Sequence, residues 1–118
     1  MNTKWNVAFE QMRIKANELG ATGVMGIAKK AAGGQVDLQL RECGKEYDEN
    51  CNFAAIVSGK ILEMVRTGKQ SGTLTPLLGE FDNFMGGVTT DNYYVAFSGA
   101  SGEDDLEIAK VGLDVLVS

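Results

Sequence analysis

The chain has 118 residues, of which 44% are hydrophobic and 23% charged, and its formal net charge is −5. These values fit one globular domain over residues 1–118 with a single buried core. The chain contains no histidine, which excludes Ser-His-Asp and Cys-His catalytic groups and imidazole ligands for zinc or haem iron. The acidic balance also argues against nucleic acid, because phosphate backbones are bound by clustered Lys and Arg.

The first 20 residues are too charged for the apolar centre of a signal peptide; they carry Lys4, Glu10, Arg13, Lys15 and Glu18. No apolar run approaches the roughly 20 residues that span a bilayer. We therefore expect a cytoplasmic protein with no membrane partner. There Cys43 and Cys51 would be free thiols, although their spacing would allow a disulfide in an oxidising compartment.

The first half of the chain predicts a helix followed by a hairpin. Residues 4–19 place apolar side chains at helical spacing, and Gly20 ends the pattern. Residues 23–31 are apolar and small, as in a buried strand. After a turn at residues 32–35, Val36, Leu38 and Leu40 alternate with polar residues, which predicts a strand with those three on its buried face.

A polar loop over residues 43–52 precedes the clearest predicted helix, which has Asn50 or Asn52 as its N-cap and ends at Gly68. Its apolar stripe is Phe53, Ile56, Val57, Ile61, Met64 and Val65. Lys60 interrupts that stripe. A lysine there either packs its stem and pairs with an acid at the helix edge, or is desolvated with a lowered pKa and acts as a base or nucleophile.

Residues 69–87 fit either a strand within residues 77–85 or a loop that covers a pocket. Residues 88–90 and 93–98 predict a second hairpin, and the apolar second strand is expected at the centre of the sheet. Ser101 and Asp104 then form a capping box for a last helix. Its predicted face is Leu106, Ala109, Gly112, Leu113 and Leu116. The fold class is therefore α+β, with about five mainly antiparallel strands and helices packed on the sheet.

The turn over residues 97–102 resembles a phosphate cradle, but the acids that follow it would repel an anion. These are Glu103, Asp104, Asp105 and Glu107. We interpret the segment as a structural turn and cap, with a glycine loop that faces a neutral or metal-bound ligand as the alternative. The same acids point in successive directions along a helix, so we predict no metal site.

Four segments together carry a resemblance to the GlcG/HbpS-like family, which includes haem-binding HbpS, GlcG and the C-terminal domain of PduO-type proteins. They are residues 32–34 with the strand ending in Arg41, the Ala-rich helix with Lys60, the segment Gly86-Gly87-Val88, and residues 97–113 with the Ser-Gly turn, acidic helix start and Ala-x-x-Gly-Leu pattern. The resemblance implies a profilin-like fold, a homo-oligomer and a pocket for a small ligand, with haem or corrinoid-related roles in some members.

The chain departs from the family after Arg41, where Glu42-Cys43-Gly44 replaces the usual Met-Asp-Gly-Ala, and residues 72–85 have no counterpart. Haem is thus a hypothesis that rests on the resemblance. Its iron would need Cys, Met or Tyr, and the spacing selects none of the candidates, which are Cys43, Cys51, Tyr47, Tyr93, Tyr94 and the five methionines.

The sequence therefore favours a non-catalytic small-ligand-binding or accessory protein that works as a homo-oligomer. We predict no catalytic residue. The candidate ligand-binding residues are Arg41, Lys60, Gly86, Gly87, Ser98, Gly99 and Ser101. The alternative is an enzyme that acts on a small carboxylate or carbonyl compound with Lys60 and Arg41.

Overall fold

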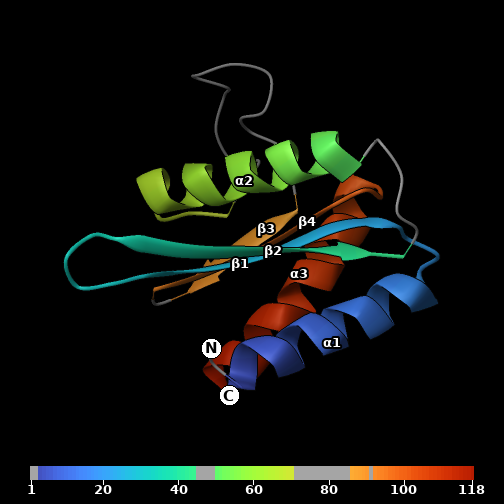
Figure 1. Cartoon of the computed structure of the whole chain (residues 1–118), viewed down its shortest axis with the longest axis horizontal. Helices are drawn as coiled ribbons and strands as arrows, with labels where there is room; N and C mark the ends of the chain where they lie inside the picture. The colour runs from blue at the N-terminus through green and yellow to red at the C-terminus, as the bar shows by residue number, and fades with distance from the viewer. Residues whose placement is uncertain (1–2, 45–49, 71–85, 91) are drawn as a thin grey trace.

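A four-stranded antiparallel sheet separates one helix from two others (Figure 1). The structure is a computed structural model that describes residues 3–44, 50–70, 86–90 and 92–118, without the side chains of Asn50 and Cys51. In chain order the elements are α1 (Thr3–Glu18), β1 (Gly23–Lys30), β2 (Val36–Cys43), α2 (Asn50–Thr67), β3 (Gly87–Thr90), β4 (Tyr93–Ser98) and α3 (Gly102–Val117). The strand order is β2-β1-β4-β3.

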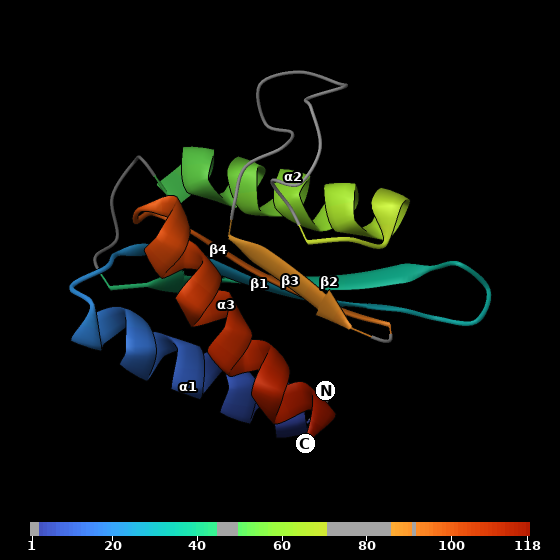
Figure 2. The ribbon, with the colours of Figure 1, turned by 180° about the vertical axis from the view of Figure 1, so that it is seen from behind.

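The sheet is covered on both faces because its two central strands are apolar on both sides. Successive side chains of a strand point to opposite faces. Met25 and Ile27 of β1 therefore join the core under α1 and α3, whereas Val24 and Ala28 join a second cluster under α2. Figure 2 shows α1 and α3 side by side on one face, with α2 alone on the other. The molecule is thus a three-layer α+β domain with the sheet in the middle.

The close packing of α1 against α3 depends on Gly112. A Cβ atom at that position would lie 2.5 Å from Sδ of Met12 and 3.1 Å from Cγ1 of Val95. Glycine therefore allows α3 to approach both α1 and the sheet. This brings α3 down onto the sheet and fixes where its N-terminal turn meets the end of β4.

Both predicted hairpins and all three predicted helices are present, and β4 lies at the centre of the sheet as expected. The described residues hold four strands, and the segment in which a fifth was considered, residues 77–85, lies outside them. β2 continues to Cys43, so the predicted loop is shorter, and Cys43 is buried as a free thiol. α2 begins at Asn50, so both N-cap candidates, Asn50 and Asn52, lie inside the helix, and the residue before it is outside the described residues.

Two predicted faces were wrong in part. The apolar side chains of β2 were expected to be buried, yet Leu38 and Leu40 are exposed because β2 lies at the edge of the sheet. On α3 the buried face includes Asp105 and Ile108, whereas Leu106 is only partly buried. None of the helices in the described part of the chain has the length and apolar character needed to cross a membrane.

Candidate functional site

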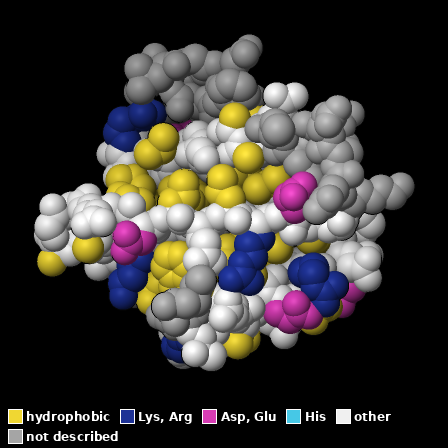
Figure 3. All heavy atoms as spheres, viewed as in Figure 1, with side chains coloured by type: hydrophobic (Ala, Val, Ile, Leu, Met, Phe, Trp, Pro, Cys, Tyr) yellow, Lys and Arg dark blue, Asp and Glu magenta, His cyan; other side chains and the backbone are white. Residues whose placement is uncertain are grey.

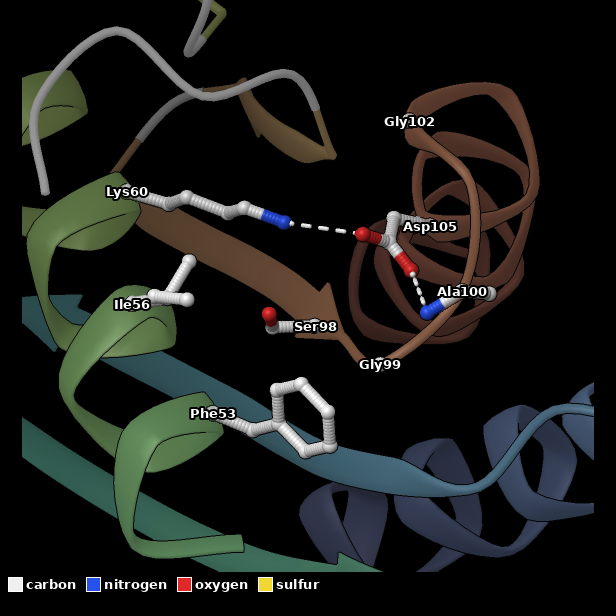
Figure 4. Close-up of a pocket in the computed structure, with 8 residues that line it drawn as sticks. All are labelled: Phe53, Ile56, Lys60, Ser98, Gly99, Ala100, Gly102 and Asp105. Carbon is white, nitrogen blue, oxygen red and sulfur yellow. Dashed lines mark hydrogen bonds and ion pairs between the residues drawn. The ribbon is translucent and has the colours of Figure 1, made fainter. Parts of the chain in front are cut away.

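A cavity of about 320 Å³ lies between α2 and the turn that joins β4 to α3 (Figure 4). α2 supplies one wall through Phe53, Ile56 and Lys60. The opposite wall comes from the end of β4, the following turn and the first turn of α3, through Ser98, Gly99, Ala100, Gly102 and Asp105. Segments about 40 residues apart in the sequence therefore build one site.

Lys60 lies at the inner end of the α2 wall, and its side chain is only 1% exposed. It occupies a position of α2 that faces the sheet, in line with Val57 and Met64, so the helix carries it into the interior. Its Nζ atom donates to Oδ2 of Asp105 at 3.1 Å and to the backbone carbonyl of Phe97. The buried ammonium is thus held between a carboxylate and the backbone of β4.

Asp105 is the buried partner of Lys60 and belongs to the first turn of α3. Its Oδ2 atom accepts from Lys60, and its Oδ1 atom accepts from the backbone N–H of Ala100 at 3.0 Å. Ser101 caps the same helix, because its hydroxyl oxygen accepts from the backbone N–H of Asp104 at 3.2 Å. The carboxylate therefore ties α3 to α2 and also closes the turn before α3.

Burial acts on the two charges of this pair in opposite directions. Desolvation lowers the pKa of Lys60, and the nearby Asp105 carboxylate opposes that shift. Desolvation likewise raises the pKa of Asp105, and the Lys60 ammonium opposes it. Each charge thus needs the other, since an unpaired charge in this position would carry the full cost of leaving water.

Gly86 makes room for the ion pair. Its φ angle is +122°, which favours glycine. A Cβ atom there would lie 2.6 Å from Nζ of Lys60 and 2.6 Å from Cβ of Asp105. The adjoining Gly87 belongs to β3 and pairs with Ala96. Gly86 is therefore a spacing residue beside the cavity, and Gly87 is a residue of the sheet.

Ser98 presents a hydroxyl to the cavity from the last position of β4 (Figure 4). Its side chain is buried, at 4% exposure. Among the residues that the structure describes, none forms a hydrogen bond with this hydroxyl. Gly99 follows with φ +139°, and its chain passes so close to Thr22 that a Cβ atom would overlap the Thr22 carbonyl. The tight turn thus aims the hydroxyl inward.

The predicted site residues fall into three groups. Lys60, Ser98 and Gly99 line the cavity, and Gly86 touches its ion pair. Ser101 is exposed and caps α3, and Gly87 is part of β3. Arg41 lies apart from all of them.

Arg41 is on the face of the sheet that packs against α1. Its guanidinium lies 4.3 Å from the ring centroid of Phe9, and Nη2 donates to Oδ1 of Asn6 at 2.6 Å. α2 and Lys60 lie on the other face of the sheet (Figure 1). The structure therefore does not bring Arg41 and Lys60 together, and the predicted site that used both was wrong, because the alternation of β2 directs Arg41 to the far face.

Asp105 is the site residue that the sequence pattern does not single out, because it stands among four acids at the start of the helix. The sequence does contain a signal for its burial, because the apolar stripe of α3 continues backward, at helical spacing, to Asp105. The stripe consists of Leu116, Leu113, Gly112, Ala109 and Ile108. Lys60 interrupts the stripe of α2 in the same way, so Lys60 and Asp105 bring buried charges of opposite sign from two helices; Glu63 is a second buried charged residue of α2.

The described lining of this cavity holds no donor for haem iron. Cys, Met and Tyr are the ligand types available to this chain, and none is among the described lining residues. Cys43 lines a different cavity of about 210 Å³, with Arg13 and Asn17, and burial raises the pKa of its thiol. Within the described residues no three Cys, Asp or Glu side chains gather as a metal site. The described residues that line this cavity therefore do not fit haem ligation.

Fold and cavity together define the class: an α+β domain in which a buried Lys–Asp pair forms one end of a small-molecule-sized cavity. No family model and no curated protein matches the sequence. Among solved structures, a crystal structure of the Klebsiella pneumoniae protein ORFY, described as DUF336, matches with a TM-score of 0.68 over 95% of this chain and 89% of that one. The two sequences are 17% identical, so the match shows a shared fold.

Proposed function

We propose that this protein is a non-catalytic small-ligand-binding protein of the GlcG-like, DUF336 type, and that its ligand occupies the cavity between α2 and α3. Two independent lines support the family. The four sequence segments that carry the resemblance span most of the chain, and the fold matches that of ORFY along 95% of it.

The observation that carries the proposal is the polar wall of the cavity. A buried hydroxyl without a partner costs about 1–3 kcal/mol, and the Ser98 hydroxyl faces the cavity with none among the described residues. A buried ion pair such as Lys60–Asp105 is also seldom more stabilising than apolar residues of equal volume. Groups that cost stability and line a cavity are typical of a binding site.

The walls also indicate the kind of ligand. Phe53 and Ile56 give an apolar surface, and the charge of Lys60 is compensated by Asp105. Glu103 and Asp104, in the adjoining first turn of α3, would repel an anion. The cavity therefore suits a small uncharged molecule with an apolar body and one group that hydrogen-bonds to Ser98.

The alternative is an enzyme that uses Lys60 and Arg41 together, but Arg41 lies on the face of the sheet opposite Lys60. Lys60 itself already donates to Asp105 and to the Phe97 carbonyl. An amine engaged in this way is a poor nucleophile. We therefore propose that Lys60 and Asp105 build the cavity wall and take no part in a reaction.

The proposal includes self-association and a cytoplasmic location. The free thiol of Cys43 is compatible with that location.

Native mass spectrometry of freshly purified full-length protein tests the proposal, followed by a thermal-shift screen with uncharged fragments. Ile56→Trp places a large side chain at the cavity wall. Leu62→Trp makes the same change at an exposed position of the same helix and is the matched control. We expect a retained molecule or a fragment-induced rise in Tm for the wild type and for Leu62→Trp, and its loss for Ile56→Trp.

Equal binding by Ile56→Trp and the control would exclude this cavity. A ligand recovered chemically altered after incubation with wild-type protein, but not with Lys60→Met, would favour the enzyme instead.

A further inference from the structure

β2 is an edge strand whose outer side offers a surface for strand pairing. In the described part of the chain its one strand neighbour is β1. An unpaired edge leaves a row of backbone N–H and C=O groups ready to pair with another strand. Beside that edge, Leu38 is 44% and Leu40 is 37% exposed. Apolar side chains form a band between α2 and β2 on this side of the molecule (Figure 3).

We propose that a second copy of this chain covers the edge, with the two β2 strands paired antiparallel about a two-fold axis at Gln39. Such an interface uses the same surface on both copies, so each residue must suit the residue that the axis places opposite it. With the axis at Gln39, Leu38 of one copy lies opposite Leu40 of the other, and Asp37 lies opposite Arg41.

The charges of β2 select this register over its neighbours. Leu38 and Leu40 share the α2 face of the strand, and Asp37 and Arg41 share the opposite face. An axis moved to Leu40 would place Leu38 opposite Glu42. An axis moved to Leu38 would leave Asp37 and Arg41 without opposite charges. The axis at Gln39 places Val36 opposite Glu42 near the strand ends, but of the three it alone pairs leucine with leucine and acid with base at the same time.

Arg41 is held in a position that suits this contact. Its guanidinium stacks on Phe9, and Nη2 donates to Asn6 and to Oε1 of Gln39 at 3.1 Å. A guanidinium has five N–H donors in a fixed plane, so it can keep these contacts and also bind a carboxylate of the partner. Charges on an edge strand usually prevent pairing, but these two become complementary in a two-fold pair.

Light scattering after size exclusion tests the interface with the full chain. We expect the wild type to have at least twice the 12.6 kDa mass of one chain. Asp37→Arg and Arg41→Asp each place like charges opposite one another, and each should weaken self-association about 100-fold or more. A 1:1 mixture of these two variants restores opposite charges at both contacts, so we expect it to associate again.

Leu38→Lys is a second variant that leaves the contacts of Arg41 intact, and it should also dissociate the protein. Val117→Lys introduces the same charge at an apolar side chain of equal exposure, 44%, on α3 and is its control. A monomeric wild type would overturn the proposal. So would variants that stay associated, or a mixture that remains monomeric while circular dichroism shows both chains folded. The interface rests on the self-association included in the proposed function, but none of these outcomes depends on whether the cavity binds a ligand.

Discussion

The Lys60–Asp105 pair joins two layers of the molecule through one contact. Lys60 comes from the helix above the sheet and Asp105 from a helix below it, and they meet past the end of β4. Each group has a further partner, the Phe97 carbonyl for Lys60 and the Ala100 N–H for Asp105. The pair therefore fixes the spacing of the cavity walls as well as their charge.

Replacing Asp105 alone should be more harmful than replacing both members of the pair. Asp105→Asn leaves the Lys60 ammonium buried without a counter-charge, and we expect the free energy of unfolding to fall by about 3–5 kcal/mol. The double variant Lys60→Met with Asp105→Leu removes both charges and should recover most of that loss. Urea denaturation measures both values.

Glu103→Gln is the control for this experiment, because Glu103 is an exposed acid in the same helical turn. It should change stability by less than about 1 kcal/mol. If the double variant were as unstable as Asp105→Asn, the pair would contribute more than charge compensation.

At the scale of elements, the features that depend on a few neighbouring residues could be predicted from the sequence. The turn with Gly34, the apolar stripe of α2 and the Ser101 cap were all readable from a few neighbouring residues, and all are present. The pairing of β1 with β4 joins segments about 70 residues apart, and no local pattern marks it. That pairing places the end of β4, and with it Asp105, beside Lys60, whereas the alternation of β2 turns Arg41 to the other face. The cavity residues could therefore be predicted singly, but not their grouping.

The role of Ser101 illustrates the same limit and can be tested. The sequence predicted Ser101 both as the cap of the last helix and as a ligand candidate, and the structure shows the cap. Ser101→Ala should lower the free energy of unfolding by about 1 kcal/mol, because the Asp104 N–H loses its acceptor, whereas Ser101→Asn should retain most of the stability.

Chemical denaturation measures the stability of both Ser101 variants, and the retained ligand mass is followed alongside. A loss of binding by Ser101→Ala with unchanged stability would return Ser101 to the binding site.

At the scale of the whole molecule, two cores share one sheet. The cluster under α1 and α3 and the cluster under α2 both take side chains from β1 and β4, in alternation. Neither core can lose its packing without exposing strands that the other needs. We therefore expect the domain to unfold in one cooperative transition, although its helices lie on opposite faces.

Trp5 allows a direct test because it is the single tryptophan of the chain and lies on the buried face of α1. Met64→Ala creates a cavity in the other core, on α2, and should cost about 2–5 kcal/mol. If the cores are coupled, Trp5 fluorescence reports the same lowered urea midpoint as far-ultraviolet circular dichroism, even though Met64 lies across the sheet. Met12→Ala, in the core that contains Trp5, is the matched control and should shift both signals together. A Trp5 transition that Met64→Ala leaves unmoved would mean that α2 unfolds independently, and the cavity wall it provides would then be separable from the rest of the domain.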